Sequence, residues 1–269
     1  MVQHFVITRF DLAADGRPVR KRTAPGWLDR RFDLFETFCL PSMAGQTITP
    51  FHWLVYFDEA TPVPYYERIG RAKLWVDFEA RFVTPFTPAL VARDVAKRTD
   101  PAADIVLTTW IDIEHAVARN FIERTQKEAA CTPTNSVVSF RNGLAFKDGK
   151  VYPASATSKG VSTIVEDGNR PFKAIWAAAQ DAPTGHRSVR LVQGAPAWLQ
   201  VVQCLCPPNR VMGPRVGDHA ALRAFSLDQG VSIRPVSRTA LLCDRLIGAP
   251  FRSVCGGAIA LAQRLVGRS

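Results

Sequence analysis

Residues 105–126 read I-V-L-T-T-W-I-D-I-E-H-A-V-A-R-N-F-I-E-R-T-Q, and this segment decides the fold that we expect. Residues 105–111 form an unbroken run of apolar and β-branched side chains, which is typical of a strand buried on both faces. Further along, Val117, Phe121 and Ile122 recur at helical spacing among polar residues and predict an amphipathic helix. A buried strand that leads into a helix is the repeating unit of an α/β fold.

Two acidic residues, Asp112 and Glu114, stand between the predicted strand and the predicted helix. Residues two apart in an extended segment point to the same side, so both carboxylates can face one point. Ligands of open α/β sheets bind beyond the C-terminal ends of the strands, and two carboxylate oxygens suit Mg²⁺ or Mn²⁺. The same acids would equally suit the first turn of the helix, where negative charge is stabilising. The residues alone leave both interpretations open.

The preceding part of the chain alternates between the same two kinds of element. Apolar runs predict strands, and apolar residues at helical spacing predict helices between them. Such an order is typical of a mostly parallel sheet with helices on both faces. The predicted strands are residues 4–9 and 51–57, and the predicted helices are at about 28–39, 65–78 and 90–95.

Polar residues also follow the first two predicted strands. Thr8 and Arg9 end the first strand, and Asp58 ends the second. Parallel strands present their C-terminal ends at one edge of a sheet, so we expect these residues to share a crevice with Asp112.

Beyond residue 130 the pattern changes to short strands. A D-G pair at residues 148–149 within the run 144–152 predicts a β-hairpin. The acidic pair Glu166 and Asp167 follows a strand expected at 161–165, and from the residues alone it reads as a solvated turn. We expect this β-rich segment to pack on the same sheet as the first part of the chain. The remaining predicted elements are a strand at 137–140 and helices at 172–178, 218–228, 237–247 and 254–267.

The overall composition indicates a globular protein with an anionic partner. The chain has 269 residues, 47% of them hydrophobic, and a net charge of +10. It contains no zinc-finger, RNA-binding aromatic or phosphate-loop motif, so we expect no nucleic-acid partner. No apolar run approaches the roughly 18 residues of a membrane-spanning helix. No basic leader precedes the first apolar run, and we therefore expect a cytoplasmic protein.

Several blocks of the sequence, in this order, resemble a family of bacterial rhamnosyltransferases. The resemblance runs along most of residues 4–213 and implies a GT-A fold, in which a mostly parallel central sheet is flanked by helices. We accordingly expect a GT-A-like domain over residues 1–230 and a basic helical tail over residues 231–269. The blocks are H-F-V-I-T-R-F (4–10), W-L-x-x-R-x-x-L-F-E-x-F-C-L-P-S (27–42), F-x-W-L-V-Y-F-D-E-x-T-P (51–62), L-T-T-W-I-D-I-E-H-A (107–116), V-E-D-G (165–168) and W-L-Q-V-V-Q (198–203).

The resemblance implies a hexosyltransferase that moves a sugar, such as rhamnose, from a nucleoside-diphosphate donor to a glycan or lipid-linked acceptor. It assigns Asp112 and Glu114 to a divalent cation, Mg²⁺ or Mn²⁺, on the donor diphosphate. Thr8, Arg9 and Asp58, together with Asp112, would line the nucleotide-sugar pocket.

The general base that accepts the proton of the acceptor hydroxyl is also implied by the resemblance. Glu166 takes this role, and Asp167 is equally available for it.

The sequence departs from the family pattern at three positions. Trp110 stands where the family has arginine, His115 where it has a third acid, and Gln203 where it has a histidine. These departures favour a second interpretation, in which the chain keeps the fold but acts as a glycan-binding or partner-binding module.

The C-terminal tail combines basic and apolar residues. Such helices can lie on an anionic membrane, attracted by charge and held by apolar burial. They would equally close the core with their arginines facing solvent. The first interpretation would place the protein at the inner face of the cytoplasmic membrane. From residue 234 onward the arginines are 234, 238, 245, 252, 264 and 268, against one acid, Asp244.

Overall fold

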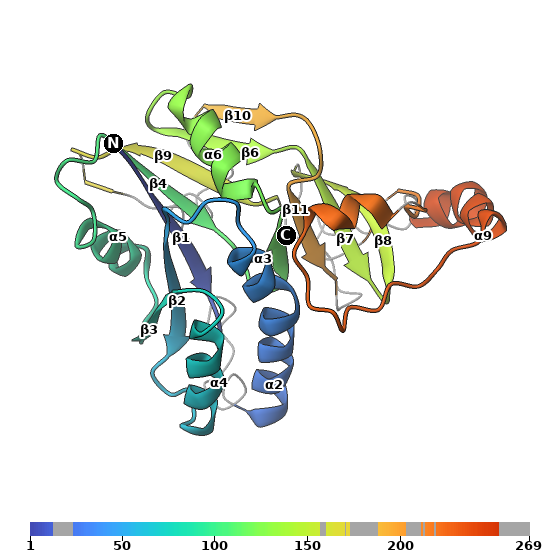
Figure 1. Cartoon of the computed structure of the whole chain (residues 1–269), viewed down its shortest axis with the longest axis horizontal. Coiled ribbons are helices and arrows are strands. Elements are labelled where there is room, and N and C mark those ends of the chain that lie inside the picture. The colour runs from blue at the N-terminus through green and yellow to red at the C-terminus, as the bar shows by residue number, and fades with distance from the viewer. Residues whose placement is uncertain are drawn as a thin grey trace, which may run out of the picture.

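The computed structural model describes residues 1–12, 24–156, 160–169, 171–172, 188–202, 211, 213–217 and 219–252. These residues form a large sheet covered by helices and a smaller sheet beside it, with the helix α9 at the far end of the molecule (Figure 1). Within these residues, no helix has the length and apolarity needed to cross a membrane.

The large sheet is mostly parallel, as predicted. Its strands follow the order β10-β6-β9-β4-β1-β2-β3, and only β9 runs antiparallel to its neighbours. The apolar runs at residues 4–9, 51–57 and 105–111 are therefore confirmed as its central strands. The bounds are β1 (Val2–Arg9), β2 (His52–Asp58), β3 (Glu79–Val83), β4 (Ile105–Trp110), β6 (Ser136–Phe140), β9 (Ser162–Asp167) and β10 (Val189–Val192).

Helices cover both faces of this sheet because side chains alternate along its strands. Val6 of β1 packs in one cluster with side chains of the continuous helix α2–η1–α3, of α4 and of α6. Its neighbours Phe5 and Ile7 pack on the other face with Val91 and Val95 of α5. The result is a three-layer arrangement. The helices are α2 (Pro25–Leu34), η1 (Phe35–Cys39), α3 (Leu40–Ala44), α4 (Pro64–Lys73), α5 (Pro88–Ala96) and α6 (Phe121–Ala130).

The smaller sheet corrects two predictions. Residues 115–117, which we expected to begin a helix, form the short strand β5 (His115–Val117) instead, and α6 begins only at Phe121. The strand is favoured because Ala116 and Val117 are buried on opposite faces and pair with Leu199 and Trp198 of β11.

The β-rich segment also divides between two sheets, whereas we expected it to join one. Strands β6, β9 and β10 join the large sheet, and the rest form the smaller sheet in the order β5-β11-β7-β8. The predicted hairpin at the D-G pair is confirmed, since Asp148 and Gly149 have φ values of 50° and 73°, as its turn requires. The remaining bounds are β7 (Asn142–Lys147), β8 (Lys150–Ser155) and β11 (Trp198–Val201).

The described part of the C-terminal region packs against the smaller sheet. Val231 and Ile233 contact its core, and the Arg234 N–H donates to the carbonyl of Gly149. Helices predicted at 218–228 and 237–247 correspond to η2 (His219–Ala224) and to α9 (Arg238–Cys243) with η3 (Asp244–Gly248). The helix predicted at 254–267, and that at 172–178 beyond its first residue, lie outside the described residues. The domain boundary after residue 230 stays a prediction.

Candidate active site

The C-terminal ends of β1, β2 and β4 meet at one edge of the large sheet. β1 lies between the other two strands, with Arg9 opposite Tyr56 of β2 and Ile7 opposite Trp110 of β4. Asp58 and Asp112 therefore lie at the same end of the sheet, as predicted. This edge is where α/β sheets bind their ligands.

The segment after β4 keeps an alternating pattern that exposes its two acids. Ile111 and Ile113 are buried in the core, while Asp112 and Glu114 are partly exposed. Both carboxylates interact electrostatically with Arg31. The helix-start interpretation is excluded by the geometry, because the N-cap of α6 is Asn120 and the acid of its first turn is Glu123.

Asp112 is oriented by an aromatic ring and faces a histidine. Its Oδ1 accepts a hydrogen bond of 2.9 Å from the Trp110 Nε1–H, and its Oδ2 lies 3.7 Å from His115 Nδ1. The Arg9 guanidinium lies over the Trp110 ring, 5.7 Å from its centroid. Trp110 and His115, which both depart from the family pattern, thus contact Asp112, which the pattern shares.

Asp58 and Asp11 form the turn that follows β2. The carboxylate Oδ1 of Asp58 accepts the Ala60 N–H at 2.9 Å, and the Asp58 N–H donates to Asp11 Oδ1 at 2.7 Å. Both carboxyl groups are buried. Burial raises the pKa of Asp11 to about 6, although the hydrogen bond from the Asp58 N–H opposes this rise.

Thr8 lies at the same edge but points into the core. It is fully buried, and its hydroxyl accepts a hydrogen bond of 2.9 Å from the Trp53 Nε1–H. Among the residues predicted to line the nucleotide-sugar pocket, Arg9 and Asp112 are the partly exposed ones, whereas Thr8 and Asp58 are buried behind them.

Arg31, at the C-terminal part of α2, is a site residue that was not assigned from the sequence. Its Nε–H donates to the carbonyl of Phe10, and its guanidinium lies 4.9 Å from the centroid of the Trp27 ring. Burial lowers the pKa of Arg31 to about 10, and the carboxylate of Glu114 is the main opposing influence. Arg31 therefore stays charged at neutral pH. The sequence did contain a clue, because Arg31 is the R of the W-L-x-x-R block.

Two further polar side chains extend the site onto the smaller sheet. His115 and Gln200 are buried and stand directly opposite each other in β5 and β11, so both side chains lie on one face. Within the described part of the chain, both ring nitrogens of His115 and the Nε2 of Gln200 have no hydrogen-bond partner. Buried polar groups are almost always hydrogen-bonded, so this pair indicates a place for a polar ligand or for ordered water.

Glu166 and Asp167, to which the resemblance assigns the role of general base, do not lie at this edge. β9 runs antiparallel to β4, so Glu166 is opposite Val106 and Asp167 is opposite Ile105, at the start of β4. Asp112 is six positions beyond Val106, which corresponds to about 20 Å at 3.3 Å per residue. Glu166 and Asp167 therefore lie at the opposite end of the large sheet from Asp112.

The acids at the edge suit a divalent cation that a substrate's phosphates would help to hold. Mg²⁺ typically binds through one or two carboxylates together with phosphate oxygens, and Asp112 and Glu114 offer that pair. Among the described residues, no group of three or more His, Cys, Asp or Glu side chains could hold a metal ion by itself. Gln203, at the position of the family's late histidine, lies outside the described residues.

Comparison with known proteins identifies the family of this chain. A family model described as putative rhamnosyl transferase matches residues 3–187. A comparison with curated protein sequences found no match.

Similar solved structures include a protein in complex with UDP and a CTP transferase. S. aureus TarS 1-349 in complex with UDP is 9% identical, with a TM-score of 0.44, and the match covers 75% of this chain and 61% of that chain. For a longer S. aureus TarS structure the values are 10%, 0.42, 74% and 37%. For the inositol-1-phosphate CTP transferase of T. maritima they are 9%, 0.40, 78% and 91%. The chain thus spans less than two thirds of the length of these TarS chains.

Proposed function

Because the chain belongs to the putative rhamnosyl transferase family, we propose that it transfers a sugar from a nucleoside-diphosphate donor bound at the edge formed by β1, β2 and β4. The donor sugar is a hexose, with rhamnose as the first candidate, and the acceptor is a glycan or a lipid-linked sugar. The GT-A type of fold is part of the same proposal.

One observation carries this proposal: two arginines and two partly exposed acids lie together at this edge. Arg9 and Arg31 are close enough to influence each other, and Arg31 also interacts with Asp112 and Glu114. Sugar transfer breaks the bond between the anomeric carbon and the diphosphate, so negative charge grows on the leaving oxygen. Fixed positive groups at that point stabilise the transition state more than the bound donor, which accelerates the reaction.

The residues divide between the two parts of the donor. Arg9 and Arg31 bind the diphosphate, and Asp112 and Glu114 hold the divalent cation. When bound, Mg²⁺ or Mn²⁺ would supply further positive charge for the leaving diphosphate. Asp58 and Asp11 fix the turn after β2 that borders the nucleotide.

In this proposal, the polar pair His115 and Gln200 on the smaller sheet binds the sugar. His115 and Gln200 present buried hydrogen-bond donors and one acceptor near Asp112, and a hydroxyl group of the sugar or of the acceptor would satisfy them. A site that needs such a hydroxyl discriminates strongly against analogues that lack it, since the buried groups would then stay unpaired.

The test compares wild-type protein with Asp112→Asn. The amide keeps the oxygen that accepts from Trp110, so the fold should be unchanged, but it removes the negative charge. We expect wild-type protein to melt at a higher temperature with a nucleoside diphosphate and Mn²⁺ than with either alone. The variant should lose this stabilisation and the release of nucleoside diphosphate in a transfer assay. Asp77→Asn, which changes an exposed acid elsewhere, is the control.

A protein that gains no stability from any nucleoside diphosphate with Mn²⁺ would contradict the proposal. So would an Asp112→Asn variant that melts at a much lower temperature but binds as well as wild type.

The second candidate is a binding module without transfer activity. The observation that favours it is the absence of Glu166 and Asp167 from the edge, together with the contacts that Trp110 and His115 make with Asp112. Donor binding that depends on Asp112, with no sugar transferred to any acceptor, would support this candidate.

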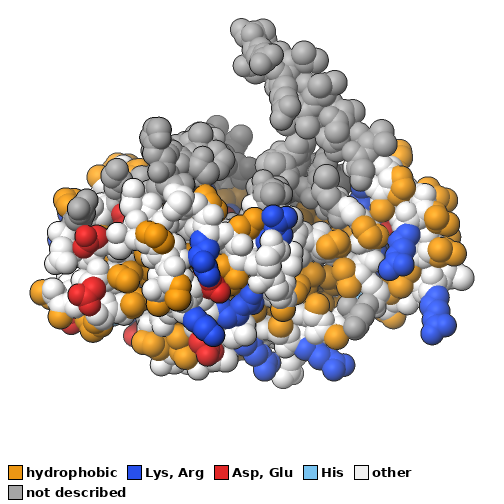
Figure 2. All heavy atoms as spheres, turned by 90° about the horizontal axis from the view of Figure 1, so that it is seen from above, with side chains coloured by type: hydrophobic (Ala, Val, Ile, Leu, Met, Phe, Trp, Pro, Cys, Tyr) orange, Lys and Arg blue, Asp and Glu red, His pale blue; other side chains and the backbone are white. Residues whose placement is uncertain are grey.

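We also propose a peripheral position at an anionic membrane through the C-terminal region. In α9 and η3, Leu242, Leu246 and Ile247 are exposed beside Arg238 and Arg245. Figure 2 shows hydrophobic side chains next to Lys and Arg side chains at the end of the molecule that α9 forms. Such a surface would bring the active edge, which is the edge of the large sheet where β1, β2 and β4 end, to a lipid-linked acceptor.

A further inference from the structure

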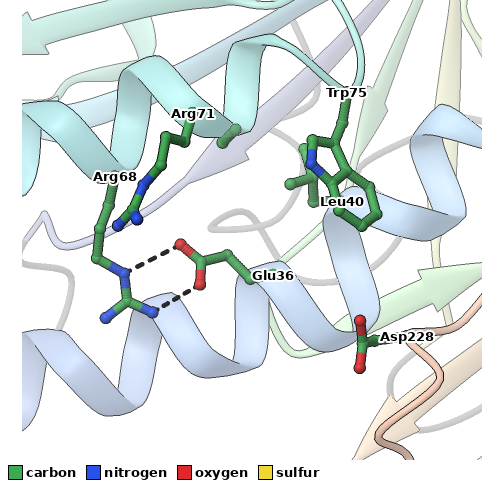
Figure 3. Close-up of a pocket in the computed structure, with 7 residues that line it drawn as sticks. Glu36, Leu40, Arg68, Arg71, Trp75 and Asp228 are labelled. Atoms are coloured by element: carbon green, nitrogen blue, oxygen red, sulfur yellow. Dashed lines mark hydrogen bonds and ion pairs between the residues drawn. The ribbon is translucent and has the colours of Figure 1, made fainter.

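A second pocket lies between two helices, away from the active edge. It has a volume of about 440 Å³ and is bounded by the continuous helix α2–η1–α3 on one side and by α4 on the other (Figure 3). α4 starts after the C-terminal end of β2 and runs back toward the start of β3, where Glu79 pairs with Leu54. The lining residues are Glu36, Leu40, Arg68, Arg71, Ala72, Trp75 and Asp228.

An exposed indole and an aliphatic side chain form one end of this pocket. Trp75 follows the last turn of α4 and is 59% exposed, which is unusual for so large an apolar ring. In Figure 3 its ring lies beside Leu40 of α3, so the two offer one continuous apolar surface. A Trp face that is not covered by the protein is available to pack against a ligand.

The opposite end of the pocket holds Arg68, which is paired with the acids Glu36, Asp33 and Asp29. Arg68 donates two hydrogen bonds to Glu36, of 3.0 and 2.6 Å, and one of 2.9 Å to Asp33. Its guanidinium also lies 4.8 Å from the centroid of the Phe32 ring. Because Arg68 is held from several sides and fixes Glu36 through two hydrogen bonds, the pair presents ordered hydrogen-bonding atoms with little loss of side-chain entropy on binding.

Two charged groups of opposite sign complete the lining. Arg71 is exposed, and within the described residues its side chain makes no hydrogen bond or ion pair. Asp228 uses its Oδ1 to accept the Gly230 N–H at 2.7 Å, and its N–H donates to the carbonyl of Thr37, so its backbone is fixed. Among the described residues, no hydrogen bond is made to the Oδ2 of Asp228, so this oxygen can accept one from a ligand.

This combination selects a class of ligand by its chemistry. An anion would be attracted by Arg71 but repelled by Glu36 and Asp228, while a cation would meet Arg68 and Arg71. A purely apolar ligand would remove water from the charged groups and would offer them no hydrogen bonds in its place. An uncharged ring with one apolar face and many hydroxyl groups satisfies all of these surfaces at once.

We propose that this pocket is a second carbohydrate-binding site, which holds a neutral sugar unit against the face of Trp75. Arg71, Glu36 and Asp228 would hydrogen-bond its hydroxyl groups. The existence of the site does not depend on the proposed transfer reaction, but its role does: it would hold a distant part of a long glycan whose end is at the active edge. A shallow, open pocket is suited to an inner unit of a chain rather than to a free metabolite.

The test is titration of the full-length protein with short neutral oligosaccharides of rhamnose, glucose, mannose or galactose, observed by saturation-transfer NMR on the sugar. We expect at least one of them to bind, and Trp75→Ala and Arg71→Gln each to weaken that binding by about tenfold or more. Leu74→Ala and Lys73→Gln are the matched controls, because these neighbouring exposed residues do not line the pocket. Asp112→Asn should bind the oligosaccharide normally, which separates this site from the active edge.

Four outcomes would overturn the proposal. They are the failure of every neutral oligosaccharide to bind, equal binding by wild type and Trp75→Ala, preferential binding of inorganic phosphate through Arg71, and a self-association in solution that Trp75→Ala abolishes. The last would show that Trp75 forms an interface between copies of the chain. Circular dichroism of each variant confirms that the exposed substitutions leave the fold intact.

Discussion

Arg31 shows how one side chain can link a helix to a strand end and to a charged site. Its Nε–H is bonded to the carbonyl of Phe10, just after β1, and Trp27 stacks on its guanidinium one turn earlier in α2. A planar guanidinium suits such a position better than an ammonium group, because it stacks and forks its hydrogen bonds at the same time.

We therefore expect Arg31→Lys to bind nucleoside diphosphates about ten- to a hundredfold more weakly, the range for a hydrogen bond to a charged group. The lysine keeps the charge but loses the fork and the stacking. Isothermal titration measures the affinity, and Arg30→Lys, an exposed neighbour on α2, is the control. Equal affinities for Arg31→Lys and wild type would show that Arg31 only supports the fold.

Asp11 predicts a pH dependence of stability. Its pKa is raised from 3.8 to about 6 by burial, so the folded state binds a proton that the unfolded state releases. Stability from this group is complete below about pH 4 and falls as the pH rises through about 6. The Thr61 hydroxyl, which lies 2.9 Å from Asp11 Oδ2 and 2.6 Å from the Asp58 carbonyl oxygen, donates to the carboxylate and opposes the rise in the pKa of Asp11, but the effect of burial is larger.

Asp11→Asn should therefore stabilise the protein at pH 8 by about 1–3 kcal/mol and have little effect at pH 5. The amide NH₂ can donate to Thr61 at every pH, and the amide oxygen still accepts from the Asp58 N–H. Urea unfolding at the two pH values measures the difference, with Asp77→Asn as the control. A variant that is less stable than wild type at pH 8 would show that the carboxylate is required.

At the scale of single elements, the strands that end at the active edge were predictable and the element after them was not. Long apolar runs located β1, β2 and β4 within one or two residues of their observed ends, and their polar tips identified Arg9, Asp58 and Asp112. β5 could not be found from local pattern, because its three residues become a strand only through pairing with β11, about eighty positions away.

The direction of β9 explains why the positions of Glu166 and Asp167 could not be predicted from the sequence. Nothing in residues 161–167 shows that this strand is inserted antiparallel between β4 and β6, which carries Glu166 and Asp167 to the opposite end of the sheet. Arg31 was missed for a related reason, because its distance to Asp112 is set by helix packing across the sheet and not by spacing along the chain.

This placement makes a prediction about Glu166. Glu166→Gln should leave the rate of sugar transfer unchanged, whereas Asp112→Asn should abolish transfer in the same assay. The glutamine replaces a buried carboxyl in β9 without changing its shape, and a melting curve corrects for any loss of folded protein. A large fall in the rate constant for Glu166→Gln, with an unchanged melting temperature, would restore its role as the base.

At the scale of the whole molecule, the net charge of +10 and the exposed apolar side chains of the C-terminal region both favour contact with an anionic membrane. α9 is attached by one side only. Leu241 packs closely against Gly217, and Arg252 pairs with Asp244 while its guanidinium lies 5.0 Å from the centroid of the Tyr152 ring. Arg252 is thus a structural residue, in contrast to the exposed Arg238 and Arg245.

The outward side of α9 and η3 is apolar where a helix of a soluble domain is usually polar. Leu242, Leu246, Ile247 and Phe251 are between 57% and 71% exposed. Each basic residue near an anionic bilayer contributes about 1 kcal/mol of attraction, and apolar side chains that enter the interface add to it.

We expect the full-length protein to float with vesicles of phosphatidylglycerol at low salt and to float less as salt screens the charges. Replacing Leu246 and Ile247 together by glutamate should abolish flotation, because it removes apolar burial and adds repulsion from the lipid headgroups. Leu74→Glu, at a still more exposed leucine directly after α4, should float like wild type. These substitutions spare Leu241, Asp244 and Arg252, so the attachment of α9 to the smaller sheet is preserved. Wild-type protein that never floats, even at low salt, would contradict the membrane role and leave the exposed leucines for a protein partner.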